Sequence, residues 1–175
     1  MSGILKIHSN PAGDWSFGHS WIEYQSAEGK TRTFGTWGNN PTGKGNGMFE
    51  NLELGRSSEA TRTSFINNKQ EQKMFEKIAD YQKLGEQAWT LRSPCSTFAA
   101  DVWQHTTGEQ LPFKSSLVSN PSTLASSIKE ANEHDMQLKS GVNLTPQSPL
   151  NAIEQDEKNV RNMANTQARK HTPGF

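Results

Sequence analysis

The sequence of 175 residues predicts an α+β fold in which an antiparallel sheet packs on helices. Two patterns indicate this. Residues 3–66 fall into short runs rich in aromatic and β-branched residues, separated by turn residues, as in consecutive antiparallel strands. Beyond residue 67, apolar residues recur at intervals of three and four, as in helices. The only cysteine, Cys95, falls where one of these helices is expected to begin.

Strands are expected throughout the first third of the chain. The most regular run alternates around His19 and Trp21, and a hairpin turn at residues 26–29 connects it to a return strand. The glycine-rich residues 38–47 are expected to form a mobile surface loop, and they lack the Gly-Lys-Ser/Thr ending of a phosphate-binding loop. The expected strands cover residues 3–8, 17–25, 31–37, 48–54 and 59–66.

Two further helices are expected besides the one at Cys95. The clearest covers residues 67–84, where Asn68 can cap the N-terminus with Glu71 in the capping-box position. Residues 88–92 are expected to form a short strand that leads to the cysteine. The other helix is expected from Asn120 onward, because apolar residues then recur on one side.

The segment around Cys95 has the pattern of a helix N-terminus. Ser93 is a suitable N-cap, Pro94 suits the first helical position, and Gly108 is placed to end the helix. A thiol in the first turn lies near the positive end of the helix dipole and near free backbone N–H groups. Both favour the thiolate, and the N–H groups can hold an oxyanion. A buried, structural cysteine is the alternative interpretation.

The composition argues against several functional classes. The chain carries 18 Lys plus Arg and 18 Asp plus Glu, and this zero net charge argues against general nucleic-acid binding and polybasic membrane attachment. A single cysteine excludes an internal disulfide and a Cys-rich zinc site. We expect no metal and no cofactor, because no cluster of ligands is visible. No apolar run predicts membrane insertion, and the first residues lack the apolar region of a signal peptide.

A nucleophilic cysteine needs a base within hydrogen-bond distance. Of the five histidines, His19 is the best candidate, because a strand presents its imidazole rigidly. His105 would lie roughly 15 Å from Cys95 along the same helix, which is too far for it to be the base. His8 precedes a turn, and the remaining two lie in polar segments. Without Cys95, His19 would be interpreted as a strand histidine that hydrogen-bonds a neighbour.

The order of these motifs resembles the circularly permuted papain-like hydrolases. This group includes the NlpC-type cell-wall peptidases and the lecithin:retinol acyltransferases. The similar segments are residues 18–22 (Gly-His-Ser-Trp-Ile), residues 34–38 (Phe-Gly-Thr-Trp-Gly) and residues 94–99 (Pro-Cys-Ser-Thr-Phe-Ala). The resemblance covers about residues 3–113. Pro94 departs from the pattern, in which asparagine commonly precedes the cysteine.

The resemblance implies a permuted papain-like (NlpC-type) domain with Cys95 as nucleophile and His19 as general base and acid. Cys95 would attack an amide carbonyl, form a thioester and release it by hydrolysis, with its own N–H as oxyanion donor. The third polar group of the family usually lies on the next strand, where Thr33 and Thr36 are our preferred candidates. The alternatives are Asp14, Glu23, Asn39 and a backbone carbonyl.

The resemblance also implies a target and partners. Small permuted domains of this kind resemble antibacterial effectors of type VI secretion systems, which often cut peptide bonds in peptidoglycan. We therefore expect an amidase or endopeptidase toxin that a secretion machine exports without a signal peptide. It would act in the periplasm of a target bacterium and be neutralised by an immunity protein. The pairs Trp15/Phe17 and Trp21/Trp37 are candidates for a substrate groove or, alternatively, for the core.

Two other functional classes stay open. One is a lipid-directed thiol acyltransferase or thioesterase, against which the mean hydropathy of −0.82 counts. The other is a non-catalytic binding or cargo module in which Cys95 is buried. Residues 1–140 are expected to form the hydrolase domain. Residues 141–175 are expected to form a polar linker and helical tail, because they carry few apolar residues.

Overall fold

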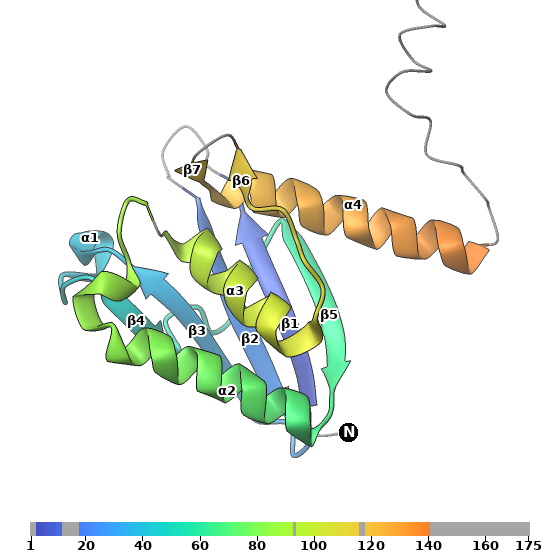
Figure 1. Cartoon of the computed structure of the whole chain (residues 1–175), viewed down its shortest axis with the longest axis horizontal. Helices are drawn as coiled ribbons and strands as arrows, with labels where there is room; N and C mark the ends of the chain where they lie inside the picture. Colours follow the sequence, from blue (N-terminus) through green and yellow to red (C-terminus); the bar gives the residue numbers. More distant parts are fainter. Residues whose placement is uncertain (1–2, 12–17, 93, 116–117, 141–175) are drawn as a thin grey trace, which may run out of the picture. The chain divides into compact units, whose positions relative to one another are not determined.

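The computed structural model describes residues 3–11, 18–92, 94–115 and 118–140, and it confirms the α+β class. Five antiparallel strands form one sheet in the order β4-β3-β2-β1-β5 (Figure 1). The strands are β1 (Gly3–Asn10), β2 (His19–Ser26), β3 (Thr31–Trp37), β4 (Gly47–Glu50) and β5 (Ala60–Ile66).

Three long helices accompany the sheet, and α2 and α3 lie on the same face of it (Figure 1). The strands β6 (Lys114–Ser115) and β7 (Val118–Ser119) form a separate small ladder. No helix in the described ranges is both long and apolar enough to cross a membrane. The helices are α1 (Asn39–Thr42), α2 (Asn68–Lys83), η1 (Gly85–Ala88), α3 (Cys95–Thr107) and α4 (Pro121–Ser140).

The core lies between the sheet and these helices. Side chains alternate along a strand, so every second residue of β1, β2 and β3 faces the helices. Each fully buried large apolar side chain contributes roughly 1.5–3 kcal/mol to the free energy of unfolding. The largest fully buried apolar side chains of this core are Leu5, Ile7, Ile22, Phe34, Ile66, Met74, Phe98, Trp103, Leu124 and Ile128.

The opposite face of the sheet carries an unusual set of rings. His8 of β1 and His19 of β2 both stack on Trp21, with ring centroids 4.9 and 5.7 Å from it. Trp37 of β3 continues the row, 3.7 Å from His19. The segment of residues 51–59 between β4 and β5 contacts this face, and its Arg56 lies over both tryptophan rings. This segment therefore covers histidines that would otherwise face solvent.

Helix ends differ in detail from the sequence expectations. Asn67, rather than Asn68, caps α2, and it forms a capping box with Gln70. Pro94, rather than Ser93, occupies the N-cap position of α3; Ser93 lies outside the described residues. Gly108 ends α3 as expected, with a φ of 81°.

Two connecting segments also differ from expectation. Residues 88–92 form only a single β-bridge at Thr90 in place of the expected strand, because η1 ends at Ala88 and a turn begins at Leu91. Residues 38–47 contain helix α1 and are tied by two hydrogen bonds: Asn39 N–H donates to Asn46 Oδ1 and Gly45 N–H to Asn39 Oδ1, each at 2.8 Å. Side-chain amides thus connect the two ends of this segment, and its expected mobility stays a prediction.

The chain divides into two compact units, residues 1–134 and residues 135–175. The first contains the sheet, α2, α3 and the beginning of α4. The predicted domain boundary near residue 140 stays a prediction, because residues 141–175 lie outside the described ranges.

Candidate active site

Cys95 is the first residue of α3 and lies against β2. Pro94 precedes it in the N-cap position. The backbone of Ser20, the second residue of β2, hydrogen-bonds to the sulfur. Ser20 lies beyond the end of the β2–β3 pairing, where Ile22 faces Phe34. The thiol therefore occupies the end of β2, where β3 no longer pairs with it.

Burial dominates the acidity of this thiol. Cys95 is 6% exposed, and loss of hydration raises its pKa to about 11. Hydrogen bonds from the backbones of Ser20, Ser96 and Cys95 act in the opposite direction, and the negative charge of Glu53 adds to the increase. The start of the helix does favour the thiolate, as expected, but burial outweighs it. The thiol therefore carries its proton at neutral pH.

His19, the first residue of β2, is bound by a buried carboxylate. Its Nε2 lies 2.9 Å from Oε1 of Glu53, which belongs to the segment between β4 and β5. The His19 and Glu53 side chains are 4% and 0% exposed. Because a carboxylate only accepts hydrogen bonds, Nε2 carries the proton, and Nδ1 of the neutral ring keeps its lone pair.

The charge state of His19 follows from its surroundings. Burial lowers the pKa of the imidazole, while the hydrogen bond and charge of Glu53 act to raise it. The positive charge of Arg56 lowers it further. The net direction is downward, so the ring is neutral at neutral pH and can accept a proton.

Glu53 accepts hydrogen bonds from three side chains. Besides His19, Trp37 Nε1 donates to Oε1 at 2.6 Å and Thr33 Oγ1 donates to Oε2 at 3.1 Å. The Glu53 N–H in turn donates to Thr33 Oγ1 at 3.3 Å. A carboxylate without hydration costs several kcal/mol unless donors replace the lost water. These three donors therefore make a fully buried Glu53 possible.

Two backbone features direct Glu53 into the sheet. A Cβ at Gly35 of β3 would lie 2.2 Å from Glu53 Oε1 and 3.2 Å from His19 Nε2, so this position has room only for glycine. Asn51 adopts a φ of 65°, a conformation that asparagine tolerates better than most residues, and its Oδ1 accepts from Thr33 N–H at 3.1 Å. The chain thereby turns back over the sheet directly after β4.

The structure places Cys95 and His19 at the same end of β2 but on different sides of the sheet. The Ser20 backbone contacts the sulfur, whereas alternation along β2 directs His19 to the face that carries Glu53. Among the described residues, no hydrogen bond joins the thiol to the imidazole. The negative charge of Glu53 nevertheless raises the pKa of the Cys95 thiol, so the thiol and the His19–Glu53 pair interact electrostatically.

These contacts favour Glu53 over the two threonines as the third group. Thr33 contacts Glu53 and does not contact His19. Thr36 faces the helices, and its fully buried Oγ1 has no hydrogen-bond partner. Neither hydroxyl orients His19, because the carboxylate of Glu53 occupies that position.

Two of the alternatives for the third group have other partners in the described residues. Glu23 forms an ion pair with Lys6 at 2.7 Å, and Asn39 Oδ1 accepts the N–H of Gly45 in the glycine-rich segment. Asp14 lies outside the described residues, as do Trp15 and Phe17. Trp21 is fully buried, on the face of the sheet opposite the helices.

Sequence reasoning missed Glu53 because residues 48–54 resemble a strand. In the structure β4 ends at Glu50, and residues 51–59 form an irregular segment. The available signal was the spacing of Asn51 and Gly55, both of which adopt positive φ and mark a turn rather than a strand. A carboxylate inside such a turn can point into a site.

Comparison with known proteins adds nothing to this site. The chain matches no family model, no curated protein and no solved structure. The described residues also contain no group of three or more His, Cys, Asp or Glu side chains able to hold a metal ion. The function is therefore argued from the geometry of the Cys95, His19 and Glu53 side chains and from the sequence motifs.

Proposed function

We propose that the protein is a cysteine hydrolase with Cys95 as nucleophile, His19 as general base and Glu53 as the residue that orients His19. The hydrogen bond between His19 Nε2 and the fully buried carboxylate of Glu53 carries this proposal. This hydrogen bond favours the tautomer in which Nδ1 of His19 is the basic nitrogen. His19 lies at the end of β2, the strand against which the thiol packs. Titratable groups buried and paired in this way occur preferentially at catalytic sites.

In the proposed reaction, both groups start uncharged. As the Cys95 sulfur attacks an amide carbonyl carbon, its proton passes to Nδ1 of His19 and the carbonyl electrons move onto the oxygen. This transfer requires the thiol and the imidazole to meet past the end of β2, where β3 no longer pairs with that strand. The N–H of Cys95 at the helix start is the proposed donor for that oxyanion, in place of its contact with the sulfur in the resting site. The amine leaves with the proton from His19, and a thioester is formed. His19 then takes a proton from the water that attacks the thioester carbon, and it returns this proton to the Cys95 sulfur as the C–S bond breaks and the acid is released. Glu53 stabilises each transient imidazolium.

We propose the stem peptides of peptidoglycan as the substrate. The protein would then be an antibacterial toxin that acts in the periplasm of a target bacterium. A secretion machine would export it and an immunity protein would neutralise it. These proposals rest on the resemblance of the sequence motifs to type VI effectors. The amide hydrolysis inferred for the site suits them.

A non-catalytic binding or cargo module is the second candidate. The burial of Cys95 and the absence, among the described residues, of a hydrogen bond from its thiol to His19 favour this alternative. In catalytic sites without substrate, such hydrogen bonds are often long or poorly aligned and tighten when substrate binds. Hydrolytic activity therefore decides between the two candidates.

The deciding experiment is digestion of purified peptidoglycan by the full-length protein, with mass analysis of the fragments. We expect new free amines and carboxylates from the stem peptides, unchanged by chelators and lost once Cys95 is alkylated. Intact stem peptides after prolonged incubation would overturn the proposed substrate. Cleavage that a chelator abolishes would overturn the proposed chemistry.

A further inference from the structure

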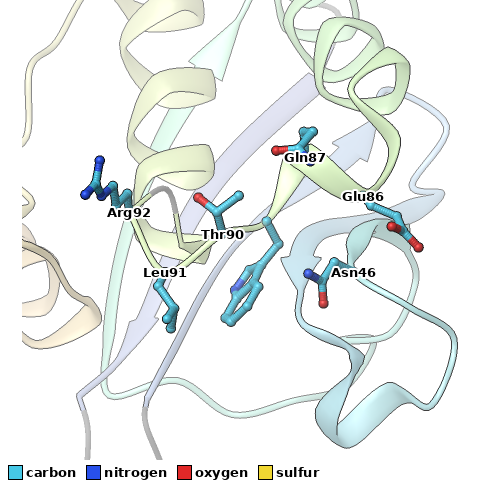
Figure 2. A pocket seen from close by; sticks show the side chains of 7 residues that line it. Asn46, Glu86, Gln87, Thr90, Leu91 and Arg92 are labelled. Atoms are coloured by element: carbon cyan, nitrogen blue, oxygen red, sulfur yellow. The ribbon is translucent and has the colours of Figure 1, made fainter.

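A pocket of about 620 Å³ opens beside the chain segment that leads to Cys95. Its walls are Asn46, from the glycine-rich segment, and the run of residues 86–92 apart from Ala88. Figure 2 shows Asn46 and Glu86 on one side of the pocket and Leu91 and Arg92 on the other. Neither Cys95 nor His19 lines it, so it is distinct from the site described above.

The wall formed by the glycine-rich segment is ordered by its own side chains. The Oδ1 of Asn46 is occupied by the Asn39 N–H, so the amide nitrogen is the group that Asn46 can offer a ligand. Gly45 has a φ of 84°, and a Cβ there would lie 3.4 Å from Glu86 Oε1. The segment therefore lies against η1 and its end, and one wall of the pocket exists before any ligand binds.

The half-buried indole of Trp89 supplies the large apolar surface of the pocket. Three atoms of its six-membered ring would lie 3.0–3.2 Å from a Cβ placed on Gly38. The ring thus packs directly on the Gly38 backbone, which restricts its orientation. A fixed aromatic ring at the wall of an open pocket is suited to a ligand with a flat apolar side.

The remaining groups indicate what else the ligand must carry. Asn46 offers an amide N–H donor, and Gln87 offers an amide that both donates and accepts; hydroxyl groups can pair with either. The charges of Glu86 and Arg92 cancel, so the pocket selects neither an anion nor a cation. A ligand with one flat C–H side and several hydroxyl groups fits both requirements.

We propose that this pocket binds a sugar ring of a neutral glycan, with the C–H side of the ring against Trp89 and its hydroxyl groups on Asn46 and Gln87. Residues 89–92 continue directly toward Pro94 and Cys95. A peptide attached to the bound sugar would extend toward the thiol. Only this last step rests on the proposed hydrolase function; sugar binding does not.

The test is an NMR titration of the full chain with chitotetraose, performed on Cys95→Ala so that binding is separated from hydrolysis. We expect shifts at residues 86–92 and at Asn46, and a dissociation constant at least tenfold larger in Trp89→Ala. Phe65→Ala is the matched control, because this aromatic side chain is 63% exposed on the distant strand β5. It should bind as tightly as the parent.

Gln87→Ala is a second binding variant in case Trp89→Ala does not fold. The Gln87 side chain is exposed, so its loss should weaken sugar binding without unfolding the protein. Absence of shifts at the pocket, unchanged affinity in the variants, or equal binding of a sugar-free peptide would overturn the proposal. Sugar binding by a protein without hydrolytic activity would leave it standing and remove only the proposed reaction.

Discussion

The two buried histidines on one face of the sheet invite a direct comparison. His8 and His19 both stack on Trp21, and each has a glutamate beside its Nε2. For His19 the oxygen of Glu53 is 2.9 Å away and forms a hydrogen bond. For His8 the oxygen of Glu23 is 3.3 Å away in an ion-pair contact, and no described residue bonds Nε2 with full hydrogen-bond geometry. Position and stacking are shared, but the partners are not.

The partners indicate which histidine is free to act. His8 has its Nδ1 within 2.9 Å of the hydroxyls of both Ser58 and Thr61, and Glu23 is shared with Lys6. His19 uses only Nε2, and no described residue bonds its Nδ1. A buried histidine with structural partners on Nδ1 stabilises the fold. A histidine held by a buried carboxylate on one nitrogen keeps the other for proton transfer.

The largest expected effect separates the two histidines. His19→Ala should lower kcat/KM on peptidoglycan fragments by about 10⁴-fold or more, as loss of a catalytic histidine does elsewhere. His8→Ala should keep most of the activity and instead lower the free energy of unfolding by about 1–3 kcal/mol, because the partly buried hydroxyls of Ser58 and Thr61 lose a hydrogen-bond partner. Kinetics and denaturant unfolding of both variants measure this. Equal losses of activity would remove the distinction between the histidines.

The second effect separates the two glutamates. Glu53→Gln should lower kcat/KM by about 10²–10⁴-fold, because a neutral amide cannot stabilise the imidazolium of His19. Glu23→Gln, the matched control, should leave kcat/KM close to the parent value. A Glu53→Gln variant that is folded and fully active would show that the carboxylate only fills space.

The third expected effect is a loss of stability when a side chain is added at Gly35, where the Glu53 carboxylate lies. Gly35→Ala should lower the free energy of unfolding by about 1–3 kcal/mol, because the added methyl group meets the carboxylate. Gly47→Ala in β4 is the control, since a Cβ there meets its nearest atoms at 3.7–3.8 Å. Thermal unfolding compares the two. Equal stability of both variants would mean that the Glu53 side chain can leave the sheet at little cost.

The smallest expected effect is a shift in the pH dependence of kcat/KM when a charge near His19 is removed. Arg56 lowers the pKa of His19, so Arg56→Gln should raise it, and the acid limb of kcat/KM should move to higher pH. Glu53→Gln should move the same limb to lower pH, because Glu53 acts to raise that pKa. Arg32→Gln, a surface variant whose arginine pairs with Glu50, should not move it. An NMR titration of the His19 ring checks the direction without substrate.

Much of the fold could be predicted from local patterns, because those patterns act locally. The strand at residues 31–37 has the bounds that its alternation predicts. The cap of α2 is displaced by one residue, because Asn67 and Asn68 are adjacent and both can cap a helix. The start of α4 at Pro121 follows from Asn120, whose Oδ1 accepts the N–H of Thr123.

The sequence predicted Cys95 and His19 as site residues but did not predict Glu53, for a physical reason. Cys95 and His19 belong to elements with recognisable patterns. Glu53 belongs to an irregular segment, and its burial depends on Thr33, Trp37 and His19, which are 16 to 34 positions away in the sequence. The raised pKa of the Cys95 thiol likewise arises from tertiary packing, which no helix N-terminal pattern contains.

The central claim is that Cys95 and His19 act as one catalytic unit. Its most direct test is the hydrolysis rate of Cys95→Ala, His19→Ala and the double variant, with circular dichroism to show that each is folded. Residues that act as a unit are not additive, so each single variant should abolish activity and the double variant should be no worse than either. Substantial hydrolysis by folded Cys95→Ala would contradict the account.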